Sequence, residues 1–383
     1  MLADTRSSVL TTPKLPQNKP EFKSIMKKTK IFAVSDIHGH ATLLKSALES
    51  SGFEKNNAEH LLVVCGDCFD RGRENRAVLR FLNGVKNKVI VRGNHEDKLI
   101  QLLDRLQIND VDRHNGTDIT VREFFGSDEV TDDGRLYPDP YTEQMLRDFV
   151  RQTVDYFETE SYIFTHGFLP LHRDRTPPTL NESWRHAPDR EWPYARFTGW
   201  QEVYPLRLVP EGKTVVCGHR SASYAADFDP SRATDDFSVF SGNGIIAIDA
   251  CTVLSGRVNV LVVEDSVATP TEHCMRLRDV YFDAIARGEK QVEMRLFDEK
   301  RRDIKMGDEI IFMRDEDNGD RLRARVTGLY RYDDFHALAR DFSPEILGFP
   351  GKSSAYIGGF MESIYSQEQI GQHGALAISL CLI

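Results

Sequence analysis

Short apolar runs alternate with amphipathic stretches along the first part of the chain. The runs that resemble buried strands cover residues 31–34, 61–64, 89–91, 162–164 and 215–217. Around the early runs, apolar residues recur at helical spacing over residues 43–48, 77–82 and 99–106, and a glycine closes each of the first two patterns. Alternating strands and helices predict an α/β fold, whose ligand site lies beyond the carboxyl ends of its strands.

A side chain that can bind a metal ion follows each of these five runs at a distance of two or three residues. The carboxyl ends of neighbouring parallel strands lie at one edge of a sheet, so we expect these side chains to lie close together. The candidate metal ligands are Asp36, His38, Asp67, Asn94, His166 and His219.

The candidate ligands are of the types that bind Mn, Fe, Zn or Mg, and a carboxylate such as Asp67 has two oxygens with which to bridge two ions. Two ions about 3.5–4 Å apart can clamp phosphate oxygens and convert water to hydroxide near neutral pH. Arg71, four residues after Asp67, could hold two phosphate oxygens, and Asp70 could orient a histidine. The pattern therefore favours phosphoester hydrolysis at a two-metal site.

The pattern changes after the polar segment 266–272. A helical pattern at 277–290 is followed by strand-like runs at 291–297, 308–313 and 323–332, then by a short helix and a final run at 375–383. We therefore expect a first domain over 30–265, a linker over 266–272 and a second domain over 273–383. If the first domain is independent, removal of everything after Asp265 should leave hydrolysis of a small ester nearly unchanged.

The composition of the 383-residue chain is that of an ordinary globular protein, with 40% hydrophobic and 28% charged residues. No apolar run approaches the roughly 18 residues of a membrane helix, and the N-terminus lacks an apolar signal core. The six cysteines show no disulfide framework, so reduced thiols in a cytosol are expected. These features predict a cytoplasmic protein without a membrane partner.

The net charge of −10 is unevenly distributed. Residues 1–30 carry seven Lys and Arg against two Asp and Glu, and they are rich in Pro, Ser and Thr, so we expect a flexible basic tail over 1–29. Residues 273–383 carry 16 basic and 19 acidic side chains. This balance weakens simple RNA binding by the C-terminal part. Residues 31–265 carry 26 basic and 37 acidic side chains, and this acidic body argues against a general polyanion-binding surface.

Two long segments lie between the candidate ligands. Residues 109–140 are polar and acidic, and we expect a solvated loop or lid that shapes access to the site. The segment between His166 and His219 contains all three tryptophans, interleaved with Arg185 and Arg196. Two interpretations remain open for the tryptophans: a substrate-binding cap that stacks on a nucleobase or phosphoaryl group, or bulky anchors for a long loop.

Five motifs together resemble the calcineurin-like metallophosphoesterases. They are SDIHG (35–39), GDCFDRG (66–72), GNHE (93–96), THG (165–167) and CGH (217–219). The resemblance covers about residues 30–265 and is closest to the phosphoprotein phosphatase branch, which also contains bacterial symmetrical dinucleoside tetraphosphatases. It implies a β-sandwich flanked by helices. It departs from the family at Ser35, where a glycine is usual.

The resemblance also implies residue roles. One metal would be held by Asp36, His38 and Asp67, and the other by Asp67, Asn94, His166 and His219. In the same family His95 would be the general acid, paired with Asp70, and Arg71 would bind the phosphate. For the family's second phosphate-binding arginine, Arg196 is the first candidate and Arg185 the second.

The C-terminal part resembles the ASCH family, a small β-barrel akin to PUA domains. The resemblance rests on the motif G-x-K-x-x-E-x-R, which is present as Gly288, Lys290, Glu293 and Arg295. ASCH domains imply binding of RNA or a nucleoside. Lys290, Glu293 and Arg295 could accordingly read the edge of a base, or they could form an internal salt-bridge cluster that closes the barrel.

Together these patterns predict a phosphoesterase that depends on two divalent metal ions, Mn first, with Fe, Zn or Mg as alternatives. The expected substrate is a phosphoprotein, a dinucleoside polyphosphate or other nucleotide, or an RNA end. An alternative is an RNA- or nucleoside-binding protein whose phosphatase domain is regulatory or vestigial.

Overall fold

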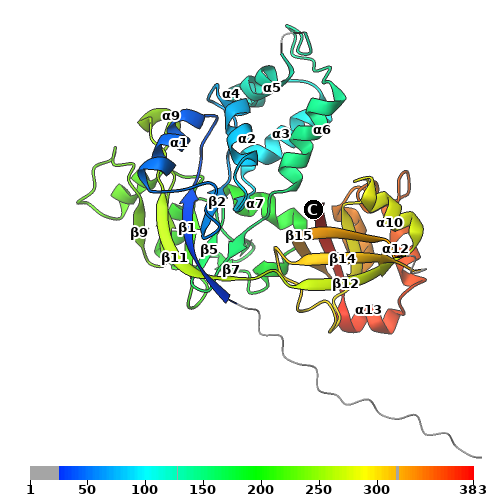
Figure 1. Cartoon of the computed structure of the whole chain (residues 1–383). Helices are drawn as coiled ribbons and strands as arrows, with labels where there is room; N and C mark the ends of the chain where they lie inside the picture. The colour runs from blue at the N-terminus through cyan, green and yellow to red at the C-terminus, as the bar shows by residue number, and fades with distance from the viewer. Residues whose placement is uncertain (1–25, 127, 316–318) are drawn as a thin grey trace, which may run out of the picture.

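The computed structural model describes residues 26–126, 128–315 and 319–383 (Figure 1). The predicted basic tail at 1–29 lies almost entirely outside the described residues. Most of the N-terminal part is a pair of facing sheets with helices on the outside, and the C-terminal part forms a separate sheet with its own helices (Figure 1).

The first sheet has the strand order β11-β1-β2-β3. Strands β1, β2 and β3 are parallel, and β11 pairs with β1 in the antiparallel direction. The strands are β1 (Met26–Val34), β2 (His60–Cys65), β3 (Lys88–Val91) and β11 (Leu261–Ala268).

The second sheet has the strand order β4-β5-β8-β10-β9, with β5, β8 and β10 parallel to one another. Its strands are β4 (Phe157–Glu158), β5 (Tyr162–Phe164), β8 (Thr214–Cys217), β9 (Phe240–Gly242) and β10 (Ile245–Ala247). A separate short hairpin is formed by β6 (Leu171–His172) and β7 (Thr179–Leu180).

The alternation of side chains along β1 explains why two layers pack on it. Ile31 and Ala33 belong to the apolar cluster between the two sheets, which also contains Phe164 of β5. Phe32 and Val34 point to the opposite face and belong to the cluster formed with the helices. The predicted β-sandwich flanked by helices is thereby confirmed.

The helices that share the apolar cluster on the outer face of the first sheet are α1 (Ala41–Ser50), α2 (Asn75–Asn83), α3 (Asn94–Arg105), α5 (Thr117–Phe125) and α6 (Pro140–Arg151). Helix α4 (Asp110–Asn115) packs against α3 and α5. Over much of 109–140 the prediction of a solvated loop was wrong. Helices α4 and α5 occupy its first half, and Val121 and Phe124 of α5 are buried in the helical core because the segment has its own apolar face.

The segment between His166 and His219 contains α7 (Trp192–Phe197), α8 (Trp200–Val203) and three short 3-10 helices, Trp184–His186, Asp189–Glu191 and Tyr204–Leu206. All three tryptophans are at most 2% exposed. Their rings are therefore anchors for this segment, and the alternative of a stacking cap was wrong for them. A further 3-10 helix, Ala222–Asp227, and α9 (Thr252–Ser255) follow.

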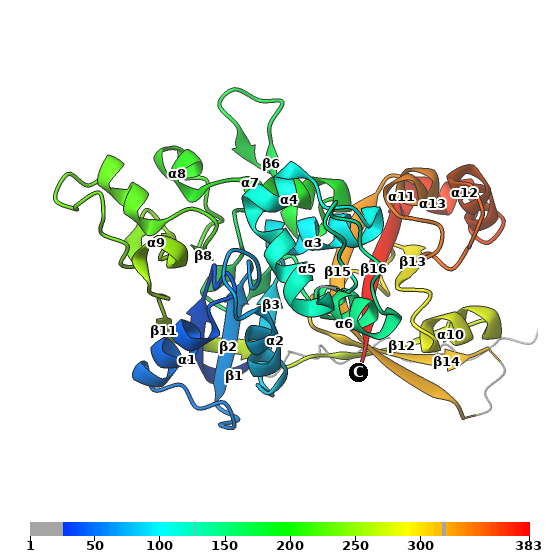
Figure 2. The ribbon, with the colours of Figure 1, turned by 90° about the horizontal axis from the view of Figure 1, so that it is seen from above.

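The C-terminal sheet has the strand order β12-β14-β15-β16-β13 and curls around its helices (Figure 2). Its strands are β12 (Glu272–Leu277), β13 (Val292–Leu296), β14 (Glu309–Arg314), β15 (Arg321–Tyr332) and β16 (Ala375–Leu382). Its helices are α10 (Asp279–Ala286), α11 (Phe335–Asp341), α12 (Ser354–Glu362) and α13 (Gln367–His373). This curled sheet agrees with the PUA-like fold that was predicted.

The N-terminal and C-terminal parts share one hydrophobic cluster. Trp184 and Trp192 belong to the same cluster as Tyr330 and Tyr332 of β15 and Phe335 of α11. A common core of this kind argues against an independent first domain, because removal of the C-terminal part would expose apolar side chains to water. No described helix is both long and apolar enough to span a lipid bilayer.

Candidate metal centre

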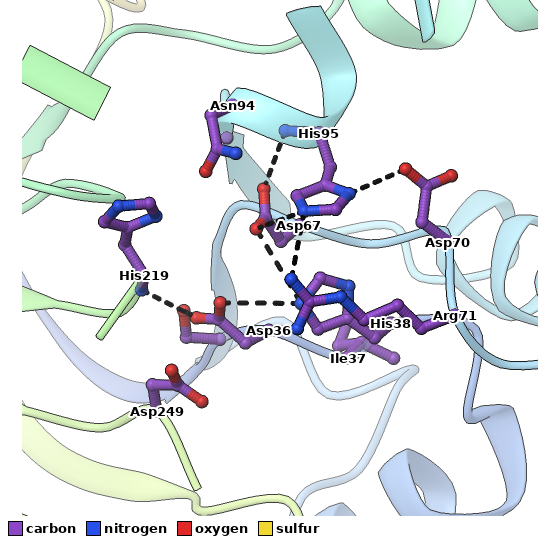
Figure 3. Close-up of polar contacts among 12 residues, drawn as sticks. Asp36, Ile37, His38, Asp67, Asp70, Arg71, Asn94, His95, His219 and Asp249 are labelled. Atoms are coloured by element: carbon purple, nitrogen blue, oxygen red, sulfur yellow. Dashed lines mark hydrogen bonds and ion pairs between the residues drawn. The ribbon is translucent and has the colours of Figure 1, made fainter. Parts of the chain in front are cut away.

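The structure brings all six candidate metal ligands to the edge of the sandwich where the strands end. Figure 3 shows Asp36, His38, Asp67, Asn94 and His219 there, and His166 lies beside Asn94 and Asp67. Several of them have an unusual backbone: Asp36, His38, Asp67 and His219 have φ angles of 50°, 45°, 53° and 64°. Non-glycine residues seldom adopt this left-handed region, and such strain is concentrated at functional sites. The sharp turns direct side chains of successive loops toward one point.

The histidines are oriented by backbone carbonyls. Nδ1 of His38 lies 3.0 Å from the carbonyl oxygen of Phe69, and Nδ1 of His166 lies 2.8 Å from that of Cys65. Because a carbonyl only accepts, each Nδ1 must carry the proton and each Nε2 of a neutral ring is left with a lone pair. His166 Nε2 faces another acceptor, Oδ1 of Asn94, at 2.8 Å. Two acceptors this close repel each other, and a cation bound to both the nitrogen and the oxygen would remove that repulsion.

His219 supplies a further free nitrogen. Its Nε2 atom is buried and has no hydrogen-bond partner among the described residues. Burial, with additional repulsion from His166 and Arg220, lowers the pKa of His219 to about 2. The ring is therefore neutral and able to bind a metal ion, which requires deprotonated imidazole.

The carboxylates need positive charge. Asp36 and Asp67 are buried, and desolvation raises the pKa of each well above its usual value, with further contributions from Asp249 at Asp36 and from Glu96 at Asp67. Buried carboxylates are costly unless a cation compensates them. The residues at this edge therefore fit bound metal ions.

Two groups of ligand atoms lie within 4.8 Å of one another: His38 with Asp67 and His95, and Asp67 with His166 and His219. Asp67 belongs to both groups, as expected of a bridging ligand. Asp36 belongs to neither group, and its Oδ2 accepts hydrogen bonds from Ser35 Oγ and the His219 backbone. Its Oδ1 nevertheless lies 3.8 Å from His38 Nε2. When bound, a pair of divalent ions would clamp phosphate oxygens and lower the pKa of water.

His95 and Asp70 form a direct pair, with His95 Nδ1 at 2.6 Å from Asp70 Oδ2 (Figure 3). The hydroxyls of Thr117 and Thr120 on α5 donate to the same carboxylate at 2.7 and 2.6 Å. Burial raises the pKa of Asp70 to about 6. Burial also lowers the pKa of His95, and the charges of Lys98 and Arg71 lower it further.

Arg71 differs from the other candidate arginines because it is exposed and pairs with no carboxylate among the described residues. Its Nη2 lies 3.4 Å from His95 Nε2, at the mouth of the site. Arg196 instead pairs with Asp97 and Asp155. Arg185 donates two hydrogen bonds to Glu158 at 2.8 and 2.6 Å, so the geometry does not support either as a second phosphate ligand.

Sequence reasoning missed Glu96, the last residue of GNHE. Its Oε2 accepts from the backbone N–H groups of Asp67 at 3.0 Å and Gly93 at 2.8 Å, and its Oε1 accepts from Cys68 at 2.9 Å. Glu96 thus ties the loop after β2 to the start of α3. Gly93 must be a glycine here, because a Cβ would lie 2.2 Å from Asp67 Oδ1.

Asp249 and the threonines of α5 were also missed. Asp249 follows β10 by two residues, which is the signal that identified the other ligands, and it is buried beside Asp36. Thr117 and Thr120 carried no signal, because they lie in a segment whose helices were not predicted.

In the C-terminal part, Lys290, Glu293 and Arg295 do come together. Glu293 lies 3.3 Å from Lys290 Nζ and 3.0 Å from Arg295 Nε. Lys290 is 3% exposed and also donates to the carbonyl of Leu347. The three residues line a cavity of about 150 Å³ whose wall includes the aromatic side chains Tyr281, Phe349, Phe360 and Tyr365. These three side chains therefore form an internal salt-bridge cluster, and they also form part of the wall of a cavity.

Comparison with known proteins agrees with this geometry. The sequence pattern of the calcineurin-like phosphoesterase family matches residues 29–251, more than half of the chain, and that of the ASCH domain matches 275–382. Serine/threonine-protein phosphatase 2 of Salmonella typhimurium (strain LT2) is 28% identical over 222 residues, which are 56% of this chain and 89% of that protein.

Two solved structures overlap different parts of the chain. A serine/threonine phosphatase from Saccharomyces cerevisiae is 12% identical with a TM-score of 0.35, covering 63% of this chain and 81% of its own. A Pyrococcus furiosus protein solved by NMR is 28% identical with a TM-score of 0.24, covering 30% of this chain and 98% of its own. Both TM-scores are below 0.5, so the assignment rests on the sequence matches and on the site: this chain belongs to the calcineurin-like phosphoesterase family, carries an ASCH domain, and is a phosphoric ester hydrolase.

Proposed function

We propose that the protein is a serine/threonine phosphoprotein phosphatase that uses two divalent metal ions, Mn²⁺ first. The observation that carries the two-metal assignment is the position of Asp67, whose Oδ2 lies 3.8 Å from His38 Nε2 and whose Oδ1 lies 3.3 Å from His166 Nε2. The residues that would hold the ions are Asp36, His38, Asp67, Asn94, His166 and His219. The similarity to the Salmonella enzyme supports a phosphoprotein substrate over a dinucleoside polyphosphate.

The residues around the metal ligands have separate tasks in this proposal. Arg71 binds the phosphate, because its guanidinium is unpaired with carboxylates among the described residues and can donate two parallel hydrogen bonds. His95 gives a proton from Nε2 to the leaving oxygen, while Asp70 accepts the hydrogen bond from Nδ1. The negative charge of a bound phosphate ester would raise the lowered pKa of His95 and favour its protonated form.

A substrate panel tests this function. The full-length protein is loaded with Mn²⁺ and given a phosphoserine peptide, diadenosine tetraphosphate and 5′-phosphorylated RNA at equal concentrations, with phosphate release as the measurement. We expect the highest kcat/KM for the phosphopeptide. A preference for diadenosine tetraphosphate or for the RNA end would refute the phosphoprotein assignment. It would not contradict the proposed two-metal site.

A second function is supported by the C-terminal cavity. Its aromatic wall and its Lys290–Glu293–Arg295 cluster offer a stacking surface, donors and an acceptor, which together suit a nucleoside. Arg278 lines the cavity and is exposed, so its removal should not disturb the fold. We expect Arg278→Ala to weaken binding of a nucleoside panel measured by calorimetry. Arg287→Ala, an exposed arginine that is absent from the cavity wall, is the matched control.

A further inference from the structure

A chain of buried polar side chains connects the C-terminal sheet to the helix that carries His95. Tyr330 of β15 donates its hydroxyl to Asp155 Oδ2 at 2.9 Å, and the other oxygen of Asp155 accepts from Arg196. Arg196 Nη1 in turn donates to Asp97 Oδ2 at 2.9 Å. Asp97 lies in the first turn of α3, two residues after His95. Figure 1 shows β15 at the side of the C-terminal domain that faces α7, which carries Arg196.

The members of this chain are shielded from solvent. Tyr330, Asp155 and Arg196 are 6%, 4% and 4% exposed. Burial alone would raise the pKa of Asp97, but Arg196 and Arg92 more than offset this and hold it below its usual value. In such surroundings a planar guanidinium between two carboxylates fixes their relative positions, and removal of one partner leaves a buried charge uncompensated.

Arg196 also contacts the loop that carries His166. A Cβ atom at Gly167 would lie 2.4 Å from the carbonyl oxygen of Arg196, so the loop after β5 packs directly on the backbone of α7. The side chain of Arg196 reaches α3 and its backbone reaches the His166 loop. Arg196 is therefore positioned between two of the segments that build the metal centre.

We propose that Tyr330, Asp155 and Arg196 are positioning residues for hydrolysis, through which the ASCH domain holds the first turn of α3 and keeps His95 in register with the leaving oxygen. The ASCH domain would then contribute to catalysis by positioning α3. This inference rests on the acid role proposed for His95.

The competing explanation is that Tyr330 only stabilises the contact between the two domains, and Tyr332 provides the matched control. Tyr332 lies two residues along β15, on the same face and in the same apolar cluster. Its hydroxyl donates to Asp341 at 2.8 Å and accepts from the backbone of Asp189 at 3.1 Å. No described contact of this hydroxyl leads to α3.

The experiment compares Tyr330→Phe with Tyr332→Phe in the full-length Mn²⁺ enzyme, using an alkyl phosphate and a nitrophenyl phosphate. Only a hydroxyl is removed in each. For Tyr330→Phe we expect kcat for the alkyl ester to fall about tenfold at unchanged KM, since misplacement of a catalytic group has effects of this size. The loss should be smaller for the nitrophenyl ester. Tyr332→Phe should lower the melting temperature about as much as Tyr330→Phe does. It should leave kcat for both esters within about twofold of the wild-type values.

A double mutant separates the possible outcomes. If Tyr330 acts through His95, adding Tyr330→Phe to His95→Ala should cause no further loss of kcat. Equal losses of kcat in the two Tyr→Phe variants, or an additive loss of kcat in the double mutant, would overturn the positioning role of Tyr330. Neither result would affect the acid role of His95. If His95→Ala affects both esters equally, the acid role fails, and the positioning proposal fails with it.

Discussion

Nδ1 of His95 lies 2.6 Å from Oδ2 of Asp70, and the same carboxylate accepts hydrogen bonds from two threonine hydroxyls of α5. Three donors thus converge on one buried carboxylate. The arrangement fixes the plane of the His95 ring and directs Nε2 toward Arg71 and the mouth of the site. A residue held in this way is suited to proton transfer. Its Nε2 also lies 3.8 Å from Asp67 Oδ2, so the metal content of a His95 variant distinguishes an acid from a metal ligand.

We therefore expect His95→Ala to slow turnover of an alkyl phosphate by roughly 10²–10⁴ and to leave the metal content unchanged. The loss should be smaller for a nitrophenyl ester, which leaves without a proton. Steady-state kinetics and metal analysis of the purified protein measure both quantities. His172→Ala, at a half-buried histidine paired with Glu182 outside the site, is the control. Equal losses for the two esters would contradict the acid role.

Asp67→Asn should abolish turnover, because it removes the charge shared by both ligand groups. The variant should also retain less Mn²⁺ after gel filtration, and exhaustive chelation of the wild type should have the same effect on activity. Asp265→Asn provides a control, since Asp265 is also buried but bonds to Thr159 and Ser161. Undiminished activity in Asp67→Asn or after chelation would contradict the two-metal mechanism.

Glu96→Gln should lower the free energy of unfolding by about 2–3 kcal/mol, because the carboxylate accepts from three backbone N–H groups and an amide offers only one acceptor oxygen. Urea unfolding followed by circular dichroism measures the change. Glu202→Gln removes a comparable charge from a single capping contact with the backbone of Gly199, and it should cost less than about 1 kcal/mol. Equal costs would show that the three contacts of Glu96 are not additive.

Asp189 should make stability depend on pH. Burial, with repulsion from Asp155, raises the pKa of Asp189 to about 6 in the folded protein. The protonated form is therefore favoured by folding, and this contribution is present below about pH 4 and is lost as the pH rises through about 6. Asp189→Asn should consequently be more stable than the wild type at pH 8 by at most about 3 kcal/mol, and equally stable at pH 4. A constant difference between these pH values would contradict the shift.

A chain that ends at Ala268 should be less stable than the full-length protein. It would lose the contacts of Tyr156, Trp184 and Trp192 with the C-terminal part of their shared cluster. We expect a lower melting temperature and increased binding of a hydrophobic dye. Wild-type stability of the truncated chain would support the independent first domain that the sequence suggested.

The sequence was sufficient to predict the main strands of the sandwich and the edge at which the candidate metal ligands come together. Asp36, Asp67 and His219 each follow a buried strand, and parallel strands necessarily bring their carboxyl ends to one edge. The rule is local, so it can be applied without knowledge of which strands are neighbours. It would have identified Asp249 as well, which follows β10 in the same way.

Only the tertiary structure decided which arginine is free, why the tryptophans are buried and how the domains are joined. Arg71 and Arg196 look alike in the sequence, but one is exposed while the other is locked between two carboxylates. The hydroxyl of Thr120 reaches Asp70 across 50 residues, and that of Tyr330 reaches Asp155 across 175. Such partners are selected by the packing of whole elements, and hydrophobic periodicity reports which face of an element is buried but not what lies against it.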